Sequence, residues 1–270
     1  MAEASLEQVP ERPPSEERAW PPTLWNWKNA IIILVLWFGG FIAVNVVQVL
    51  IVYGQAGLLD EIAAGNVEAL ETAEFVVSFE VQAVTFVGLA VVSLGAVALV
   101  NALGPKNGLR EFGFRPMERR WWLWAAGLGV GLAAARIGLA YGLFALIPSL
   151  EEGAEALAAM LVLPDPGVIE VLLSIFFISL LVPLYEEVFF RGFLHNWLRN
   201  RLPMWAAIMI SSLAFGLIHF IPVQIITAFL LGAAMAWIYE KSGSLWSAVL
   251  LHVVNNGLVA LLTYIPMLVV

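Results

Sequence analysis

Long apolar stretches alternate with short polar segments along the chain, and this pattern predicts a series of membrane-spanning helices. A helix needs about 20 mostly apolar residues to cross a bilayer. By this measure we predict seven spans, at residues 30–53, 75–103, 121–147, 169–185, 204–220, 223–239 and 245–269. A polar segment at 186–201 either extends the fourth helix or lies at the membrane interface. The pattern therefore predicts an all-α fold, a polytopic transmembrane helix bundle of about seven spans.

Composition supports a membrane protein and removes several classes of function. The chain is 61% hydrophobic and 13% charged, whereas soluble domains carry about 25% charged residues. The sequence has no cysteine, which excludes disulfides, thiolate nucleophiles and zinc–thiolate sites. A net charge of −8 and the lack of a basic patch argue against a nucleic-acid partner. We expect a disordered polar tail over residues 1–27 and a single transmembrane domain over residues 28–270.

The basic residues predict how the chain crosses the membrane. Twelve of the 13 lysines and arginines fall in the tail or in every second loop, and such residues favour the cytoplasmic side. We therefore expect a cytoplasmic N-terminus and an external C-terminus, in the inner membrane of a bacterium. The exception is Arg136, inside the third span. Its candidate partner is Glu80 in the second span, and a contact with the tail of a substrate is the alternative.

Three polar clusters lie within or beside the last four spans, where ionisable groups are expensive and are by default functional. They are Glu186-Glu187-x-x-x-Arg191, Phe215-x-x-x-His219 and His252-x-x-x-Asn256. In each cluster the outer residues are four apart, which places them on one face of a helix about one turn apart. We therefore expect an active site among the last four helices.

The carboxylates of the first cluster have different predicted roles. Glu187 and Arg191 can form an ion pair along the helix, which would neutralise both. Glu186 points about 100° away from Glu187, so that Arg191 cannot fully serve both carboxylates. Glu186 is then either a general base or a water-exposed glutamate at the interface.

The histidines leave structural alternatives open. His219 can be a hydrogen-bonded packing residue or a catalytic one. His252 and Asn256 either share a target or join helices by hydrogen bonds. His195, four residues after Arg191, is expected to pack beside it.

The turn near residues 202–203 gives an estimate of depth in the membrane. Glu186 and His219 each lie roughly 24 Å from that turn at about 1.5 Å per residue, whereas His252 lies only about 14 Å from its own turn. His252 is then shallower, unless tilt or a late helix start closes the gap.

Together the three motifs resemble the CPBP family, also called the ABI family, of CAAX-type prenyl proteases and bacteriocin-processing membrane proteins. The family pattern is EExxxR, FxxxH and HxxxN on consecutive late membrane helices. This sequence is similar over about residues 170–260, with Glu186, Glu187 and Arg191 in the first motif, Phe215 and His219 in the second, and His252 and Asn256 in the third.

The resemblance implies an intramembrane glutamic endopeptidase that needs no cofactor. Glu186 would activate a water molecule, His219 would hold that water, and His252 with Asn256 would stabilise the oxyanion, while Glu187 and Arg191 would orient the site. The implied partners are the lipid bilayer and a membrane-embedded or lipidated protein or peptide substrate.

The residues alone leave other classes of function open. A metal could bind Glu186, Glu187, His219 and His252, although the HExxH motif of zinc proteases is absent. A protein of the same fold could act without catalysis, as an immunity factor or a scaffold. A transporter is disfavoured, because the sequence has no internal repeat.

Overall fold

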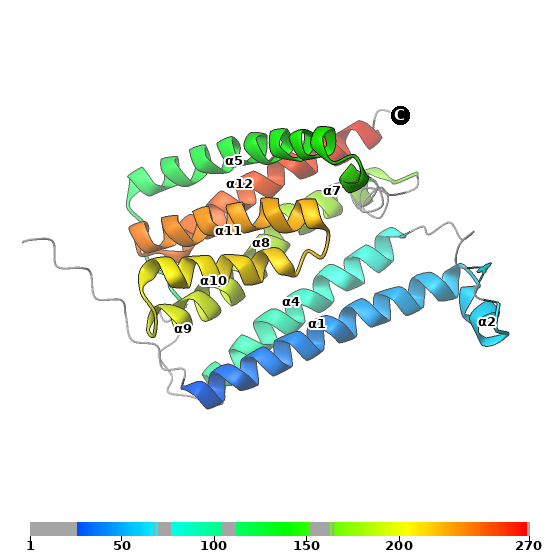
Figure 1. Ribbon diagram of the computed structural model, residues 1–270, viewed down its shortest axis with the longest axis horizontal. Helices are drawn as coiled ribbons and strands as arrows, with labels where there is room; N and C mark the ends of the chain where they lie inside the picture. Colours follow the sequence, from blue (N-terminus) through cyan, green and yellow to red (C-terminus); the bar gives the residue numbers. More distant parts are fainter. Residues whose placement is uncertain are drawn as a thin grey trace, which may run out of the picture.

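The computed structural model describes residues 26–66, 68–69, 77–103, 112–151, 163 and 165–268. The expected disordered tail over residues 1–27 lies outside this part of the chain, except for its last two residues. The described elements are helices (Figure 1): α1 (Trp27–Gln55), α2 (Leu58–Ala63), α4 (Phe79–Leu103), α5 (Arg119–Leu146), α7 (Val168–Phe176), η2 (Phe177–Leu181), α8 (Val182–Glu187), η3 (Val188–His195), α9 (Asn196–Arg199), α10 (Met204–Leu217), α11 (Pro222–Ser242), α12 (Leu245–Tyr264) and η4 (Ile265–Leu268).

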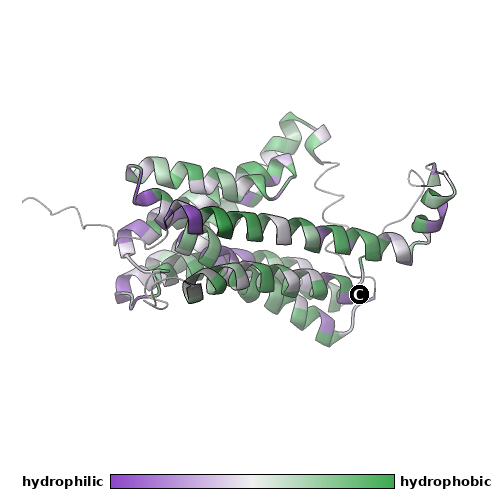
Figure 2. Cartoon of the chain, turned by 90° about the horizontal axis from the view of Figure 1, so that it is seen from below, coloured by the Kyte–Doolittle hydropathy of each residue, from purple (hydrophilic) through white to green (hydrophobic). Residues whose placement is uncertain are grey.

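The helices confirm an all-α membrane protein with about seven spans. Six helical stretches among the described residues are long and apolar enough to cross a bilayer, and α10 is a shorter apolar helix. Hydrophobic residues dominate the middle of the long helices, and hydrophilic residues gather near their ends (Figure 2). The chain is therefore an integral membrane protein.

Two of the differences from the predicted helix boundaries affect the polar clusters. The fourth span continues past residue 185 as one helical path, Val168–Arg199, so the polar segment extends the helix. Within this path, η2 and η3 are π-helical, and such wide turns occur frequently at functional sites. The fifth span ends at Leu217 instead of Phe220. Its 14 residues measure about 21 Å, less than the ~30 Å hydrocarbon core.

The helices form two groups that meet at the fourth helical path. In one group α1 packs against α4 (Figure 1). In the other, α5 packs against α12 and α10 against α11, and α11 also contacts α12. The path from α7 to α9 lies between them, because α4 contacts α8 and η3 on one side while α12 and α10 contact the same path on the other.

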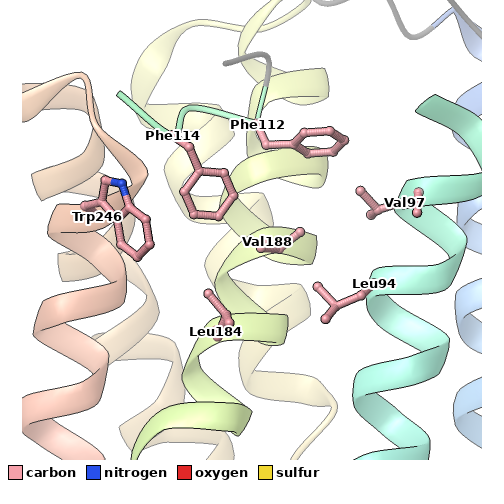
Figure 3. Close-up of a pocket in the computed structure, with 8 residues that line it drawn as sticks. Leu94, Val97, Phe112, Phe114, Leu184, Val188 and Trp246 are labelled. Carbon is pink, nitrogen blue, oxygen red and sulfur yellow. The ribbon is translucent and has the colours of Figure 1, made fainter. Parts of the chain in front are cut away.

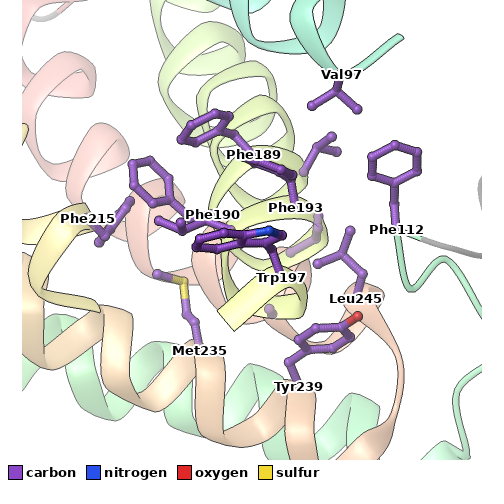
Figure 4. Close-up of a cluster of buried hydrophobic side chains, with 14 of the residues drawn as sticks. Val97, Phe112, Phe189, Phe190, Phe193, Trp197, Phe215, Met235, Tyr239 and Leu245 are labelled. Atoms are coloured by element: carbon purple, nitrogen blue, oxygen red, sulfur yellow. The ribbon is translucent and has the colours of Figure 1, made fainter. Parts of the chain in front are cut away.

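Aromatic side chains fill the contact between the two groups (Figure 4). The ring of Trp37 in α1 stacks on Phe189 in η3 at 4.1 Å between centroids. The ring of Phe190, on the next position of η3, meets Phe215 of α10 edge to face at 5.1 Å. Such pairs add about 0.5–1.5 kcal/mol each beyond the burial of their area, and they fix the orientation of the helix that carries the glutamates.

A close approach of two backbones fixes α5 on α12. A Cβ atom at Gly129 would lie 2.8 Å from the carbonyl oxygen of Leu251 and 2.8 Å from the Cβ of Val254. Real side chains do not tolerate such distances to backbone atoms, so that glycine at position 129 lets α5 lie directly on α12. Small residues serve the same purpose in other membrane helix pairs.

We predict that Gly129→Ala destabilises the protein by about 1–3 kcal/mol, as overpacking does elsewhere. Gly127 and Gly131, on the same helix, have open space where a Cβ would stand, so Gly127→Ala and Gly131→Ala serve as matched controls. The measurement is thermal unfolding of the purified protein in detergent. Equal melting temperatures for all three variants would contradict the close contact.

Candidate active site

A buried ion pair lies at the centre of the polar cluster, as the four-residue spacing predicts. The Nη1 atom of Arg191 donates to Oε1 of Glu187 at 2.9 Å, and neither side chain is exposed. The Nη2 atom of Arg191 donates to the carbonyl oxygen of Gly232 in α11 at 2.9 Å. The guanidinium also lies over the ring of Phe215, 4.6 Å from its centroid. Arg191 is thus held by three helical segments at once.

His252 joins the two glutamates from the opposite helix, α12. Its Nδ1 lies 2.9 Å from Oε1 of Glu187, and its Nε2 lies 3.7 Å from Oε2 of Glu186. Because an ionised carboxylate only accepts hydrogen bonds, the Nδ1 proton is donated to Glu187. The remaining ring nitrogen then faces Glu186.

His252 and Glu186 come together despite the different depths estimated from the turns, with Nε2 of His252 3.7 Å from Oε2 of Glu186. The turns of η3 carry more residues each than α-helical turns, because their hydrogen bonds run from i to i+5. The polar helix therefore rises less per residue than the estimate assumed, which removes part of the expected difference.

His219 lies just beyond the end of α10 and is partly buried. Its Nδ1 lies 2.9 Å from the carbonyl oxygen of Phe215. A carbonyl only accepts, so Nδ1 carries the proton and, in the neutral ring, Nε2 has a free lone pair. The ring of Phe215 contacts both histidines, with centroids 5.1 Å from His219 and 5.8 Å from His252. The next residue, Phe220, has a positive φ of 58°, a strained conformation for a bulky residue.

The two asparagines of α12 have separate partners. The Nδ2 atom of Asn256 donates to the carbonyl oxygen of Ile178, in the π-helical η2, at 3.4 Å. The neighbouring Asn255 is fully buried. Its Nδ2 donates to the carbonyl oxygen of Gly129 at 3.4 Å, and its Oδ1 accepts from Nη1 of Arg136 at 2.6 Å.

The predicted pairing of Arg136 with Glu80 is wrong. Glu80 lies in the first turn of α4 and is exposed. Arg136 instead extends from α5 to Asn255. The reason is the arrangement of the helices, since α4 packs against α1 and α5 packs against α12. Arg136 interacts electrostatically with Glu186, which places its charge beside the polar cluster.

His195 belongs to a separate buried network one turn beyond Arg191. Its Nε2 lies 3.0 Å from Oε1 of Glu240, and its Nδ1 lies 3.2 Å from the hydroxyl of Ser211. Arg199 donates to the same Glu240 oxygen at 2.9 Å. These contacts join the polar helix to α10 and α11. The network agrees with the expected packing role of His195, although its hydrogen-bonded partners are Glu240 and Ser211.

A small cavity borders Glu186, and Glu187 is not among its lining residues. The cavity lies between α1, α4 and α8, offers about 20 Å³ to the centre of a water molecule, and thus exceeds the roughly 10–15 Å³ that one water needs. The side chain of Glu186 is 12% exposed. Within the described residues, no three His, Asp or Glu side chains converge in a geometry suited to a metal ion.

A larger apolar cavity of about 450 Å³ lies beside the same helix (Figure 3). Leu184 and Val188, which flank the two glutamates in sequence, form one wall. Apolar residues of the other helices and of the segment before α5 close the rest: Leu94, Val97, Ala98, Phe112, Phe114 and Trp246. Its size is within the usual range for ligand pockets.

Sequence reasoning missed two residues that shape the site. Gly232 accepts from Arg191, and a Cβ there would lie 3.0 Å from Nη2 of that arginine. A glycine inside a helix gives no sign of such a contact in a single sequence. Asn255 stands beside the motif asparagine, and its pairing with Arg136 became visible only through the packing of α5 on α12.

Comparison with known proteins places the polar clusters within one matched segment. Residues 168–258 match the family model described as "Type II CAAX prenyl endopeptidase Rce1-like". The match covers Glu186, Glu187, Arg191, His219, His252 and Asn256, and it leaves out α1, α4 and α5.

A curated relative is also found. It is a protein of Escherichia coli described as "Uncharacterized 24.3 kDa protein", 34% identical over 116 residues. The alignment covers 41% of this chain and 53% of that protein, so the chain spans about half the length of the relative it matches. No solved structure matches the chain at a significant level.

We predict that Arg191→Met destabilises the protein by about 3–5 kcal/mol, because Glu187 would be left charged and unpaired in the interior. The double variant Glu187→Gln/Arg191→Met removes both charges and is expected to regain much of this stability. Thermal unfolding in detergent gives both values. If Arg191→Met melts at the wild-type temperature, the ion pair does not stabilise the site.

Proposed function

Because residues 168–258 belong to the type II CAAX prenyl endopeptidase (Rce1-like) family, we propose that this protein is an intramembrane endopeptidase that hydrolyses its substrate with a glutamate-activated water molecule. The observation that carries the proposal is the unequal environment of the two adjacent glutamates. Glu187 accepts hydrogen bonds from Arg191 and His252 and is fully buried. Among the described residues, Glu186 has no such donor within 3.5 Å, and it borders a cavity that fits one water. Glu186 is thus free to act as a base.

The proposed reaction uses the geometry as follows. A water molecule beside Glu186 gives a proton to the carboxylate while its oxygen attacks the carbonyl carbon of the substrate. The free Nε2 of His219 accepts the second hydrogen of that water and orients it. The protonated Glu186 then gives its proton to the amide nitrogen, and the carbon–nitrogen bond breaks. The products are a carboxylic acid and an amine, and the acid then gives its proton to the amine, with no covalent intermediate on the protein.

The remaining motif residues stabilise or position this chemistry. His252 and Asn256 are proposed to stabilise the oxyanion of the tetrahedral intermediate, His252 from Nε2 once that nitrogen has taken up a proton, and such donors contribute strongly in dry sites. The Nδ2 atom of Asn256 donates to the carbonyl oxygen of Ile178 at the long distance of 3.4 Å. We propose that it releases this weak bond and donates to the oxyanion instead. Glu187 and Arg191 fix His252 and the helix.

The proposed substrate is a membrane-embedded or lipidated protein or peptide. The site lies among apolar helices, and the 450 Å³ cavity against Leu184 and Val188 of the same helix offers a place for an apolar chain. A polar peptide in water would have no comparable contact.

We predict that Glu186→Gln abolishes cleavage without unfolding the protein. The test compares new peptide termini in membranes of cells that express the wild type or the variant at matched levels. Glu170→Gln is the matched control, since Glu170 lies on the same helical path but bonds only to the backbone of Gly167. Termini seen with the wild type and the control but not with Glu186→Gln support the proposal and identify the substrate.

Identical termini from wild type and Glu186→Gln, with both proteins folded, would reject a catalytic role for Glu186. The alternative is then a non-catalytic immunity or scaffold protein of the same fold. Its partners would be sought by cross-linking in the membrane.

We propose the bacterial inner membrane as the location, with the N-terminus in the cytoplasm. The chain has no cysteine, so that single cysteines can be labelled without background. Asp60→Cys, in α2, is expected to react with an impermeant maleimide added outside spheroplasts, whereas Glu118→Cys, just before α5, is expected to react only after lysis. The reverse pattern would invert the proposed orientation.

A further inference from the structure

Arg136 is a partly buried cation that neither the sequence motifs nor the matched family segment accounts for. It lies inside α5, outside residues 168–258. Its Nη1 bonds to the neutral amide oxygen of Asn255, and its Nε is buried with no acceptor among the described residues. No carboxylate of the described residues lies within salt-bridge distance of it. A charge in such a place is by default functional.

The hydrogen bonds around Arg136 direct its charge towards the site. Asn255 is itself anchored to the carbonyl oxygen of Gly129, so that the α5–α12 contact fixes the position of the guanidinium. Asn255 lies three residues after His252 and hence on the same side of α12. His252 in turn lies 3.7 Å from Glu186. Electrostatic interactions join Arg136 to Glu186, His219 and His252.

The balance of charge in the cluster requires a second cation. Two neighbouring carboxylates in a poorly solvated place cannot both stay ionised with one positive partner. Arg191 and His252 direct their hydrogen bonds to Glu187. A cation bonded directly to Glu186 would occupy the lone pairs that a base needs. A cation held further away supplies charge without doing so, because charge interactions extend beyond hydrogen-bond distance whereas hydrogen bonds do not.

We propose that Arg136 is a positioning residue of this site: held by Asn255, it supplies a second positive charge that favours the ionised form of Glu186 while leaving that carboxylate free to bind water. The inference rests on the proposed function and deepens it. An arginine suits the role because it stays charged in proteins. The charged or titratable groups that face Glu186 are Tyr185, Glu187, Arg191, His252 and Arg136.

The test uses the enzyme in proteoliposomes and a quenched fluorescent peptide that spans the cleaved bond, as identified from the new peptide termini in membranes. The rate of cleavage is measured between pH 6 and pH 9. Arg136→Gln is expected to lower kcat about tenfold or more at neutral pH, the effect of losing one nearby opposite charge, while KM stays nearly unchanged. Its rate should recover as the pH rises, because a less stabilised carboxylate needs a higher pH to ionise. Arg136→Lys, which keeps the charge, should retain most of the activity.

Two further variants make the outcome decisive. Arg120→Gln, on the same helix, removes an exposed cation paired with Glu118 and should behave as wild type. Asn255→Asp places a carboxylate beside Arg136 while the arginine stays in place. This variant should reproduce the loss of rate and the recovery at high pH. This variant supplies the test if Arg136→Gln fails to fold.

Several results would overturn the inference. A wild-type rate and pH profile for Arg136→Gln would exclude the charge effect. An increase confined to KM would make Arg136 a substrate-binding residue, and an equal loss at every pH that lysine does not rescue would make it a structural one. If the wild type and Glu186→Gln cleave equally, the proposed function itself fails, and that result is separate from all of these.

Discussion

The buried ion pair between Glu187 and Arg191 is the constraint on which the rest of the site depends. An arginine without exposed surface must satisfy its charge inside the protein, and here it does so with Glu187, the carbonyl oxygen of Gly232 and the ring of Phe215. These partners come from the polar helix itself, from α11 and from α10. The requirement to neutralise one side chain therefore joins three helical segments.

The same requirement gives the two neighbouring glutamates different hydrogen-bond partners. Glu187 is committed to Arg191 and His252, so its negative charge is structural. Glu186, one position earlier, lines the small cavity and approaches His252 only to 3.7 Å. Two residues of identical chemistry thus differ because a helix turns about 100° per residue. The proposed base, Glu186, lies beside a rigid support without sharing its hydrogen bonds.

Contacts within one helix could be predicted from the spacing of residues in the sequence. Contacts between helices could not. The i, i+4 rule anticipated the Glu187–Arg191 pair and the proximity of Phe215 to His219, because both depend on one helix alone. Apolar stretches located the spans to within a few residues. The partner of Arg136, in contrast, depends on which helices are neighbours, and the sequence alone favoured α4 where the structure has α12.

The wide turns of the polar helix also escaped prediction, since no residue type marks them. They altered the depth estimate for His252 and extended the helix through the charged segment. The early end of α10 is similar, because Phe220 adopts a left-handed conformation that its side chain does not favour. Features that depend on strain or on unusual hydrogen bonding are set by the surrounding structure and leave little trace in composition.

The π-helical segment η2 determines how the polar helix can absorb a change in chain length. It lies between α7 and α8, and each of its wide turns accommodates more residues than an α-helical turn. Loss of one residue between 177 and 181 is therefore absorbed when a wide turn becomes an ordinary one, and the glutamates keep their direction relative to α7. The same loss inside α8, which has no wide turn, would rotate the glutamates by about 100°. The π-helical segment is thus the part of this path where chain length can change with the least effect on the direction of Glu186 and Glu187.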